Sequence, residues 1–239
     1  MINAQTSSIA MLVHQHCETK NVDITTHPIL PVDGGQFTLG AGRAMTLADK
    51  DALIAILLNE QPEPEFLDDS LLVCSRSTIV WYRKPAIVDI PFHDGVVKAP
   101  IPGLIFIAMA GENLRCFAFK GRSRPTPETR LFYAPFGNVY SGGTFCTGNA
   151  HVPATILRSN IPAWENFVLG ATNTHAGTIH PVTEVDSIGA LMGFYQSLVA
   201  AGKQQFPSDR MVSYRTHKTY QHPHGVHITL GMVLGGAVE

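Results

Sequence analysis

The stretch GLIFIAMAGENLRCFAFKG, residues 103–121, decides the fold. It consists of two apolar runs separated by the turn-forming residues Ala110-Gly111-Glu112-Asn113. Apolar runs of this length, bounded by glycine and asparagine, are typical of strands joined by a tight turn, and such strands pair antiparallel. We therefore predict that this stretch forms two neighbouring strands of an antiparallel meander.

Further β-rich runs lie on both sides of this pair. SLLVCSRSTIVWYRKPAIVDIPF, residues 70–92, precedes it, and LFYAPF, residues 131–136, follows a proline-bearing connector. Near the N-terminus, two extended runs flank Asp33-Gly34-Gly35, which is a hairpin signal. The tail VHITLGMVLGGAV, residues 226–238, is predicted to be one more strand or a packed extension.

Three segments have the pattern of helices. Thr46 is a good N-cap with Asp49 three positions later, close to a capping box, and the helix that follows ends at QPEPE, residues 61–65. IPAWENFVLGA, residues 161–171, is a short candidate helix. Residues 186–201 carry apolar side chains at three-to-four spacing before Gly202, which suits a C-cap. Strands followed by helices, without internal repeats, predict a single α+β domain with an N-terminal addition.

Composition and charge exclude several classes of function. The chain is 45% hydrophobic and 15% charged, with a formal net charge of −2 and no basic stripe that would follow a phosphate backbone. No run approaches the roughly 20 apolar residues that cross a bilayer. The first residues lack the charged start and cleavage site of a signal peptide. We expect a cytoplasmic protein with neither nucleic acid nor membrane as partner.

The four cysteines, at positions 17, 74, 116 and 146, are too few for a disulfide scaffold and contain no CxxC pair. Cys74 and Cys116 lie in apolar runs, so we predict buried structural roles for them. Cys146 differs, because FGNVYSGGTFCTGN, residues 136–149, surrounds it with glycines and small polar residues. Such a segment forms a surface loop, where nucleophilic thiols are found. From its setting alone, Cys146 is either a nucleophile held on a surface loop or a small apolar residue that packs there, as most free cysteines do.

The segment FGNVYSGGTFC resembles the active-site segment of ubiquitin-conjugating enzymes, in which a His-Pro-Asn triplet precedes the catalytic cysteine. Asn138 precedes Cys146 by eight positions, as in that family, while Gly143 holds the turn and Phe145 fills the apolar position before the thiol. The order of helix, meander, proline-bearing link and loop is also the family's. PIPGLIFIAMAGENLRCFAF, LFYAPFGNVYSGGTFCTGN and NTHAGTIHP carry a closer likeness to its prokaryotic members, the prokaryotic ubiquitin-conjugating-like family D.

This resemblance implies an α+β, ubiquitin-conjugating (UBC-like) fold with an N-terminal helix, an antiparallel β-meander, an active-site cysteine loop and C-terminal helices. It implies an N-terminal β-rich extension (1–45), a UBC-like catalytic domain (46–203) and a C-terminal extension packed on that domain (204–239). The likeness has departures. Phe136-Gly137 replaces His-Pro, and the tryptophan expected soon after the cysteine stands further on, at Trp164.

The resemblance also implies an activity without a cofactor. Cys146 would accept a ubiquitin-like modifier as a thioester from a ThiF-like adenylating enzyme and pass it to an amine. The implied partners are that enzyme, the small ubiquitin-like protein and a JAB-type metallopeptidase. Asn138 would donate a hydrogen bond to the developing oxyanion or brace the loop. The supporting candidates are Tyr140, Gly143, His151 and His175. We expect Tyr140 and Phe145 to pack rather than to act chemically, and Glu165 and Asp186 are the acids available to assist transfer.

Three other interpretations stay open. Cys146 could serve a cysteine hydrolase with His175 or His180 as its partner, because catalytic partners need not be close in sequence. A non-catalytic scaffold that binds a ubiquitin-like protein is the second. The third is a metal site, although the spacings match no established zinc pattern and we predict no metal. Its candidate ligands are His14, His16, Cys17, His222, His224 and His227.

Overall fold

The computed structural model describes residues 8–15, 22–58, 68–148, 150, 152–176, 179–218 and 221–236. The chain divides into two units, residues 1–66 and 67–239. None of the helices in the described ranges is both long enough and apolar enough to cross a membrane.

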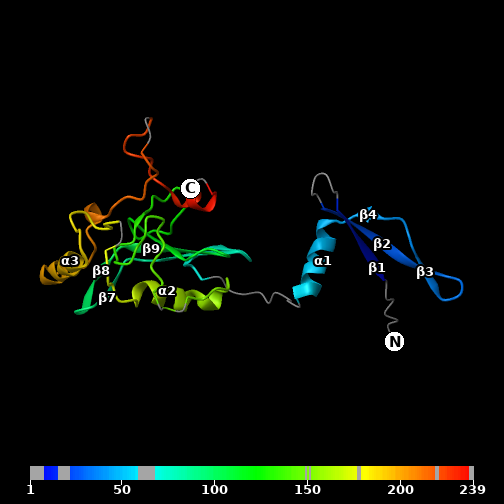
Figure 1. Ribbon diagram of the computed structural model, residues 1–239, viewed down its shortest axis with the longest axis horizontal. Coiled ribbons are helices and arrows are strands. Elements are labelled where there is room, and N and C mark those ends of the chain that lie inside the picture. The colour runs from blue at the N-terminus through cyan, green and yellow to red at the C-terminus, as the bar shows by residue number, and fades with distance from the viewer. Residues whose placement is uncertain are drawn as a thin grey trace. The chain divides into compact units, whose positions relative to one another are not determined.

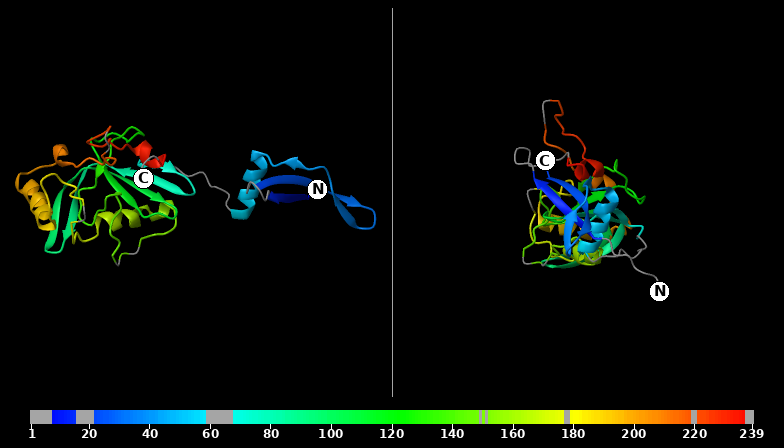
Figure 2. Two further views of the ribbon diagram at one scale, coloured as in Figure 1. Left: turned by 45° about the horizontal axis from the view of Figure 1, so that its top comes forward. Right: turned by 90° about the vertical axis from the view of Figure 1, so that its right-hand side faces the viewer.

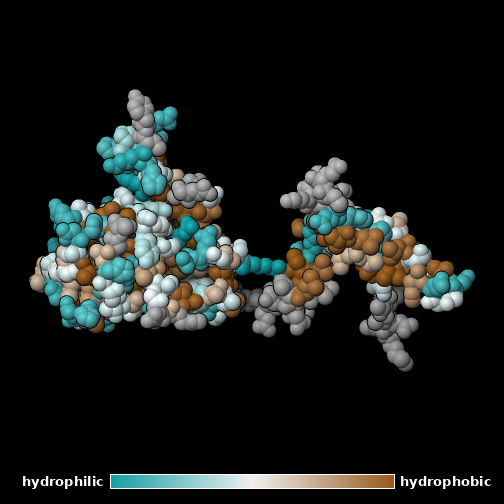
Figure 3. Space-filling view, in the orientation of Figure 1, coloured by the Kyte–Doolittle hydropathy of each residue, from teal (hydrophilic) through white to brown (hydrophobic). Residues whose placement is uncertain are grey.

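Unit 1 is built on the hairpin predicted at Asp33-Gly34-Gly35. Gly34 and Gly35 have φ angles of 88° and 77°, in the left-handed region that glycine adopts without a clash. The hairpin prediction is confirmed. Strand β2 (Val22–Val32) is central and pairs antiparallel with β1 (Ile9–Gln15), β3 (Gln36–Leu39) and β4 (Arg43–Ala44). Apolar side chains remain at the surface of these strands (Figure 3), and Phe37 is 72% exposed.

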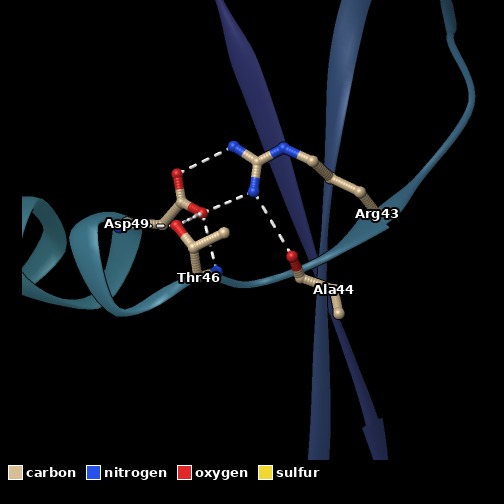
Figure 4. Close-up of polar contacts among 4 residues, drawn as sticks. All are labelled: Arg43, Ala44, Thr46 and Asp49. Carbon is tan, nitrogen blue, oxygen red and sulfur yellow. Dashed lines mark hydrogen bonds and ion pairs between the residues drawn. The ribbon is translucent and has the colours of Figure 1, made fainter.

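Helix α1 (Leu47–Leu58) begins at the predicted cap. The Thr46 hydroxyl accepts a hydrogen bond from the Asp49 amide at 3.3 Å, and the Asp49 carboxylate accepts one from the Thr46 amide at 2.8 Å. Arg43 donates to both carboxylate oxygens of Asp49, at 2.6 and 2.9 Å (Figure 4). The Arg43 guanidinium and then the Thr46 hydroxyl lower the pKa of Asp49 well below its usual range. Because Arg43 lies on β4, these bonds fix the start of α1 to the N-terminal strands.

The division of the chain into two units falls after this helix. The expected boundary at 45/46 runs between β4 and α1, whereas the units divide at 66/67 and α1 falls with the N-terminal strands. Since the contacts of Arg43 cross the expected boundary, the local structure itself joins β4 to α1.

Unit 2 contains the predicted antiparallel meander. Its five-stranded sheet has the order β11-β10-β9-β6-β5, and every neighbouring pair is antiparallel. The strands are β5 (Leu71–Cys74), β6 (Thr78–Arg83), β9 (Gly103–Met109), β10 (Arg115–Phe119) and β11 (Phe132–Tyr133). The prediction of an α+β protein with an antiparallel meander is confirmed.

Two prolines divide one long hairpin into two sheets. Strands β7 (Ala86–Phe92) and β8 (Gly95–Ile101) pair with each other between β6 and β9. The β6–β9 register ends at Arg83 opposite Leu104, and the β7–β8 register resumes in step at Ala86 opposite Ile101. Pro85 and Pro102 stand in this interval, and neither has an N–H to donate to the ladder.

Both faces of the five-stranded sheet are buried. Along β6, Ile79 and Trp81 face one core while Val80 and Tyr82 face the other. The first core is closed by α2 (Ile161–Leu169) and α3 (Ile188–Ala200), and the second by the C-terminal segment that ends in α4 (Leu230–Leu234) (Figures 1 and 2). This double cover explains why the strands are apolar at almost every position instead of alternating with polar residues.

The structure has three α-helices in the described part of the C-terminal half, and two of them were predicted. The short helix at 161–169 is confirmed, and α3 starts two residues later than predicted because Ser187 caps it, accepting a hydrogen bond from the Ala190 amide at 3.2 Å. Gly202 has φ 65°, as a C-cap glycine should. The tail is a packed extension rather than a strand, since Thr229 caps α4 and Leu230 is buried.

Candidate active site

The predicted loop around Cys146 is a short hairpin that presents the cysteine opposite Asn138. The Cys146 amide donates to the Asn138 carbonyl at 2.8 Å, and the Tyr140 amide donates to the Thr144 carbonyl at the same distance. Val139 and Phe145, between these pairs, form an isolated bridge and are buried. Because side chains alternate across a hairpin, the register places Asn138, Tyr140 and Cys146 on the other face.

The tip of this hairpin is held against the sheet. The Cys116 amide of β10 donates to the Gly143 carbonyl at 2.9 Å, and the Tyr133 hydroxyl donates to the Ser141 carbonyl at 3.1 Å. Gly143 has φ 78°, and a Cβ there would stand 2.4 Å from the Phe117 ring. Both features require glycine, so the position predicted to hold the turn does so by backbone conformation and by close packing.

Asn138 braces the base of the hairpin with its whole side chain. Its Nδ2 donates to the Thr172 carbonyl at 2.8 Å, and its Oδ1 accepts from the amide and the hydroxyl of Thr174, both at 3.1 Å, and from the His175 amide at 3.3 Å. It is 8% exposed and has φ 60°, a left-handed conformation that asparagine tolerates better than most residues. Of the two roles predicted for Asn138, the contacts match that of a brace.

Cys146 is a partly exposed thiol whose pKa is shifted by two neighbouring groups. The Tyr140 hydroxyl and then the Gly148 amide lower the pKa of Cys146, while slight burial acts in the opposite direction. The same interaction raises the pKa of Tyr140. Since both donors favour the charged form of the sulfur, the site populates the thiolate at lower pH than an ordinary cysteine does.

Tyr140 is therefore not the packing residue that we predicted. Its side chain is 42% exposed, and its hydroxyl is the group that lowers the pKa of Cys146 most. The hairpin register explains this, because Tyr140 and Cys146 are diagonal neighbours on one face of a two-stranded ribbon. Phe145, on the opposite face, is 6% exposed and packs as predicted.

The other cysteines have different surroundings. Cys116 is fully buried, and burial raises its pKa well above the usual range, as expected of a structural thiol. The prediction for Cys74 is wrong, because that thiol is exposed. Cys74 is the last residue of β5, the strand at the edge of the sheet, so no further strand covers it.

The predicted histidines do not contact the sulfur in the described part of the chain. His175 contacts Asn138 through its backbone, and its ring Nδ1 lies 3.2 Å from the Thr174 hydroxyl. His180 lines a separate small hollow with Phe136 and Ile188. His151 lies outside the described residues.

Of the two candidate acids, Glu165 already has two side-chain partners and is only partly exposed. Its carboxylate accepts a hydrogen bond from the Trp81 indole at 3.1 Å and forms an ion pair with Arg83 at 2.8 Å. Trp164, beside it on α2, stacks on Trp81 at 5.4 Å between ring centroids, in the core. Asp186 is exposed just before α3.

No group of three metal-ligating side chains occurs among the residues that the structure describes. His16 and Cys17 lie outside those residues. His14 is hydrogen-bonded to Thr25 at 3.0 Å, and the Nε2 of His227 lies 2.5 Å from the Arg215 guanidinium.

In the segment 172–175, sequence analysis named His175 as a candidate but assigned no role to Thr172, Asn173 and Thr174. Asn173 is buried, its Oδ1 accepts from the Gly137 amide at 2.6 Å, and its Nδ2 donates to the Pro91 carbonyl at 2.8 Å. With Thr174, it ties the residues before the hairpin to β7. The polar run Thr172-Asn173-Thr174-His175 was the available signal, because a cluster of such residues outside regular structure makes side chain-to-backbone bonds.

Comparison with protein-family models gives one finding that bears on this geometry. The model described as Prokaryotic E2 family D matches residues 49–214, which include most of α1, the whole sheet of unit 2, the hairpin of Cys146 and α3. Comparison with curated proteins and with solved structures gave no match. Because the family model spans well over half of the chain, the resemblance seen in the sequence is confirmed at the level of the family, and the chain belongs to the prokaryotic E2 family D.

Proposed function

We propose that this protein is a ubiquitin-conjugating-like transferase that carries a ubiquitin-like modifier as a thioester on Cys146. The observation that supports it most strongly is the combination of exposure, position and lowered pKa of the Cys146 thiol. Cys146 is accessible, is positioned by a hairpin whose base is braced by Asn138, and has its pKa lowered by the Tyr140 hydroxyl and the Gly148 amide. Membership of the E2 family supplies the reaction class.

The proposed chemistry has two steps. The Cys146 thiolate attacks the carbonyl carbon of the modifier's activated C-terminus, so that a C–S bond forms and the bond to the adenylating enzyme breaks. An amine then attacks the same carbon, the C–N bond forms, and the thiolate leaves while the amine gives its proton to solvent. A thiolate with a lowered pKa suits both steps, because a larger fraction of the thiol is ionised at any given pH and the thiolate is a good leaving group.

Tyr140 acts in this proposal through the sulfur. Its hydroxyl stabilises the thiolate before the thioester forms and again when the thiolate leaves. The same hydroxyl is released while the sulfur carries the acyl group, because a thioester sulfur is a weak acceptor. Asn138 positions the hairpin, and Gly143 permits its turn.

The closer likeness seen in the sequence extends the proposal to partners. We propose that the protein acts as protein B of a PRTRC system, in the cytoplasm, with a ThiF-like adenylating enzyme, a small ubiquitin-like protein and a JAB-type metallopeptidase. The division into an N-terminal extension, a catalytic domain that includes α1, and a C-terminal extension is part of the same proposal. The family match supports it, because it begins at residue 49, inside α1.

The direct experiment mixes the protein with its adenylating enzyme, the modifier and ATP. We expect an adduct on non-reducing gels that thiol reagents remove, and Cys146→Ser should abolish it. Cys74→Ser is the matched control, because Cys74 is also an exposed thiol and should be dispensable. If Cys146→Ser still forms the labile adduct, the assignment is wrong. Cys146→Lys should give a stable isopeptide analogue instead.

The hydrolase interpretation predicts activity in an assay that contains neither the adenylating enzyme nor ATP. The purified protein alone would cleave an amide-linked reporter of the modifier. We expect no such turnover, because the groups that lower the pKa of Cys146 are a tyrosine hydroxyl and a backbone amide rather than an imidazole.

A further inference from the structure

A cluster of cationic side chains lies where the C-terminal segment pairs with the segment around β11. Three isolated bridges set the register there, joining Arg130 to Thr229, Phe132 to Ser213, and Arg215 to His227. Leu131, Tyr214 and Ile228, which alternate with these residues, pack in the second core. The alternation therefore turns the bridged residues toward the opposite side.

These residues line an open hollow of about 470 Å³. Its lining consists of two cations, two hydroxyl groups, an aromatic ring and an imidazole, namely Lys120, Arg130, Thr129, Ser213, Phe132 and His227. Among the residues that the structure describes, none of those that line it is acidic. The Lys120 ammonium lies 5.0 Å from the centroid of the Phe132 ring, which fixes it above the floor of the hollow.

The positive charge of this hollow is not neutralised within the described part of the chain. The ion pairs found there use other cations, namely Arg43, Arg83, Arg115 and Arg210. For Glu128, the acid closest to Arg130 in sequence, Thr126 is the main cause of a lowered pKa, and Arg130 is not among the causes.

The pKa of His227 is sensitive to the positive charge around this hollow. This pKa is lowered by burial and then by Arg215, Arg130 and Lys120. Arg215 also donates to the carbonyls of His224 and Gly225, at 3.2 and 3.1 Å, so its charge is held in place beside the ring. These three cations disfavour protonation of His227, and the same positive potential favours binding of an anion.

We propose that this hollow, lined by Lys120, Arg130, Thr129 and Ser213, binds the phosphoryl group of a small ligand. A phosphoryl group offers several acceptor oxygens and negative charge, and it matches a fixed guanidinium fork, a point ammonium charge and hydroxyl donors in one place. The Thr129 hydroxyl accepts a bond from the Thr126 amide at 2.8 Å, which leaves its proton available to donate. This site stands apart from the proposed thioester chemistry and does not depend on it.

The test is a calorimetric titration of the full chain with inorganic pyrophosphate at low ionic strength. We expect one saturable site, and we expect the double variant K120M/R130M to bind roughly tenfold or more weakly, because each charge-assisted hydrogen bond contributes substantially. R76M/K98M is the matched control, since it removes one exposed arginine and one exposed lysine elsewhere and should bind like the unaltered protein.

Parallel titrations identify the source of the phosphoryl group. Inorganic phosphate and ATP are compared with pyrophosphate, and a glutamate-rich peptide tests for an acidic protein instead. Tighter binding of either phosphate compound at the same site supports the proposal and names the ligand class. Absence of saturable binding, equal losses in both double variants, or binding of the peptide alone would overturn it.

A second readout is independent of binding affinity. The pKa of His227, followed by NMR, should rise in K120M/R130M because two of the cations that lower it are gone. Saturating pyrophosphate should raise it in the unaltered protein for the same electrostatic reason. A folded variant in which this pKa does not move would contradict the proposed convergence of Lys120 and Arg130 on His227.

Discussion

The backbone amide of Cys146 donates a hydrogen bond to the backbone carbonyl of Asn138 at 2.8 Å. The eight-residue spacing between them is thus a hairpin register, in which Tyr140 and Thr144 form the next pair and Gly143 belongs to the turn. The eight-residue separation noted in the sequence is therefore the separation at which these two residues are paired across the hairpin. The proposed nucleophile and its brace are placed by one piece of local structure.

Gly143→Ala should destabilise the fold by about 2 to 4 kcal/mol, because a Cβ is strained in the left-handed region and overpacks a well-filled core. The Cβ would stand 2.4 Å from the Phe117 ring. Gly142→Ala is the neighbouring control, since it meets nothing within 4 Å. Denaturant unfolding of both variants measures the difference, and equal stabilities would show that the hairpin tip does not pack as described.

Tyr140→Phe should raise the pKa of Cys146, because it removes the donor that lowers it most. The pH profile of iodoacetamide labelling at Cys146, followed by mass spectrometry of its peptide, should shift to higher pH and show slower labelling at neutral pH. Tyr214→Phe is the control, since that tyrosine lines a hollow at the tip of the same hairpin but is not among the groups that shift the pKa of Cys146. An unchanged profile in Tyr140→Phe would remove Tyr140 from the proposal.

Asn138→Ala should cost about 2 to 3 kcal/mol of stability, because it leaves buried partners of the brace without hydrogen bonds. Thioester formation should fall in step with the loss of ordered structure at 172–175, observable as amide chemical-shift changes. Asn113→Ala, at an exposed position, should change stability by less than about 0.5 kcal/mol. Loss of transfer with full stability retained would assign Asn138 to the oxyanion instead of the brace.

Glu165→Gln should leave transfer to an amine intact. Its ion pair with Arg83 is partly exposed, so we expect a stability loss of about 1 kcal/mol or less. Asp186→Asn, measured beside it, tests the other acid. Single-turnover discharge of the thioester to lysine gives the rate for each. A large loss of rate in folded Glu165→Gln would mean that this carboxylate acts in the reaction despite its contacts with Trp81 and Arg83.

Local signals predicted much of the fold. The Asp33-Gly34-Gly35 hairpin, the cap at Thr46 and the helix before Gly202 depend on turn and cap residues that act within a few positions. The meander was predictable because its strands follow one another in sequence and in the sheet. The identity of the elements that cover each face of the sheet could not be predicted from the strands, since an apolar run does not indicate which segments pack on it.

The parts of the site that sequence missed depend on register or on distant partners. Tyr140 lowers the pKa of Cys146 because the hairpin register makes the two residues diagonal neighbours. Asn173 acts through contacts with Gly137 and Pro91, far away in sequence. Cys74 is exposed because β5 lies at the edge of the sheet, and strand order is a property of the assembled sheet.

The most direct measurement of the central claim is intact-protein mass spectrometry of an unreduced reaction with the adenylating enzyme, modifier and ATP. We predict one adduct with the mass of the modifier less one water, located at Cys146, that free thiols remove completely. An adduct that survives thiol treatment, maps to Cys74 or persists in Cys146→Ser would contradict the account, as would no adduct beside a fully charged adenylating enzyme.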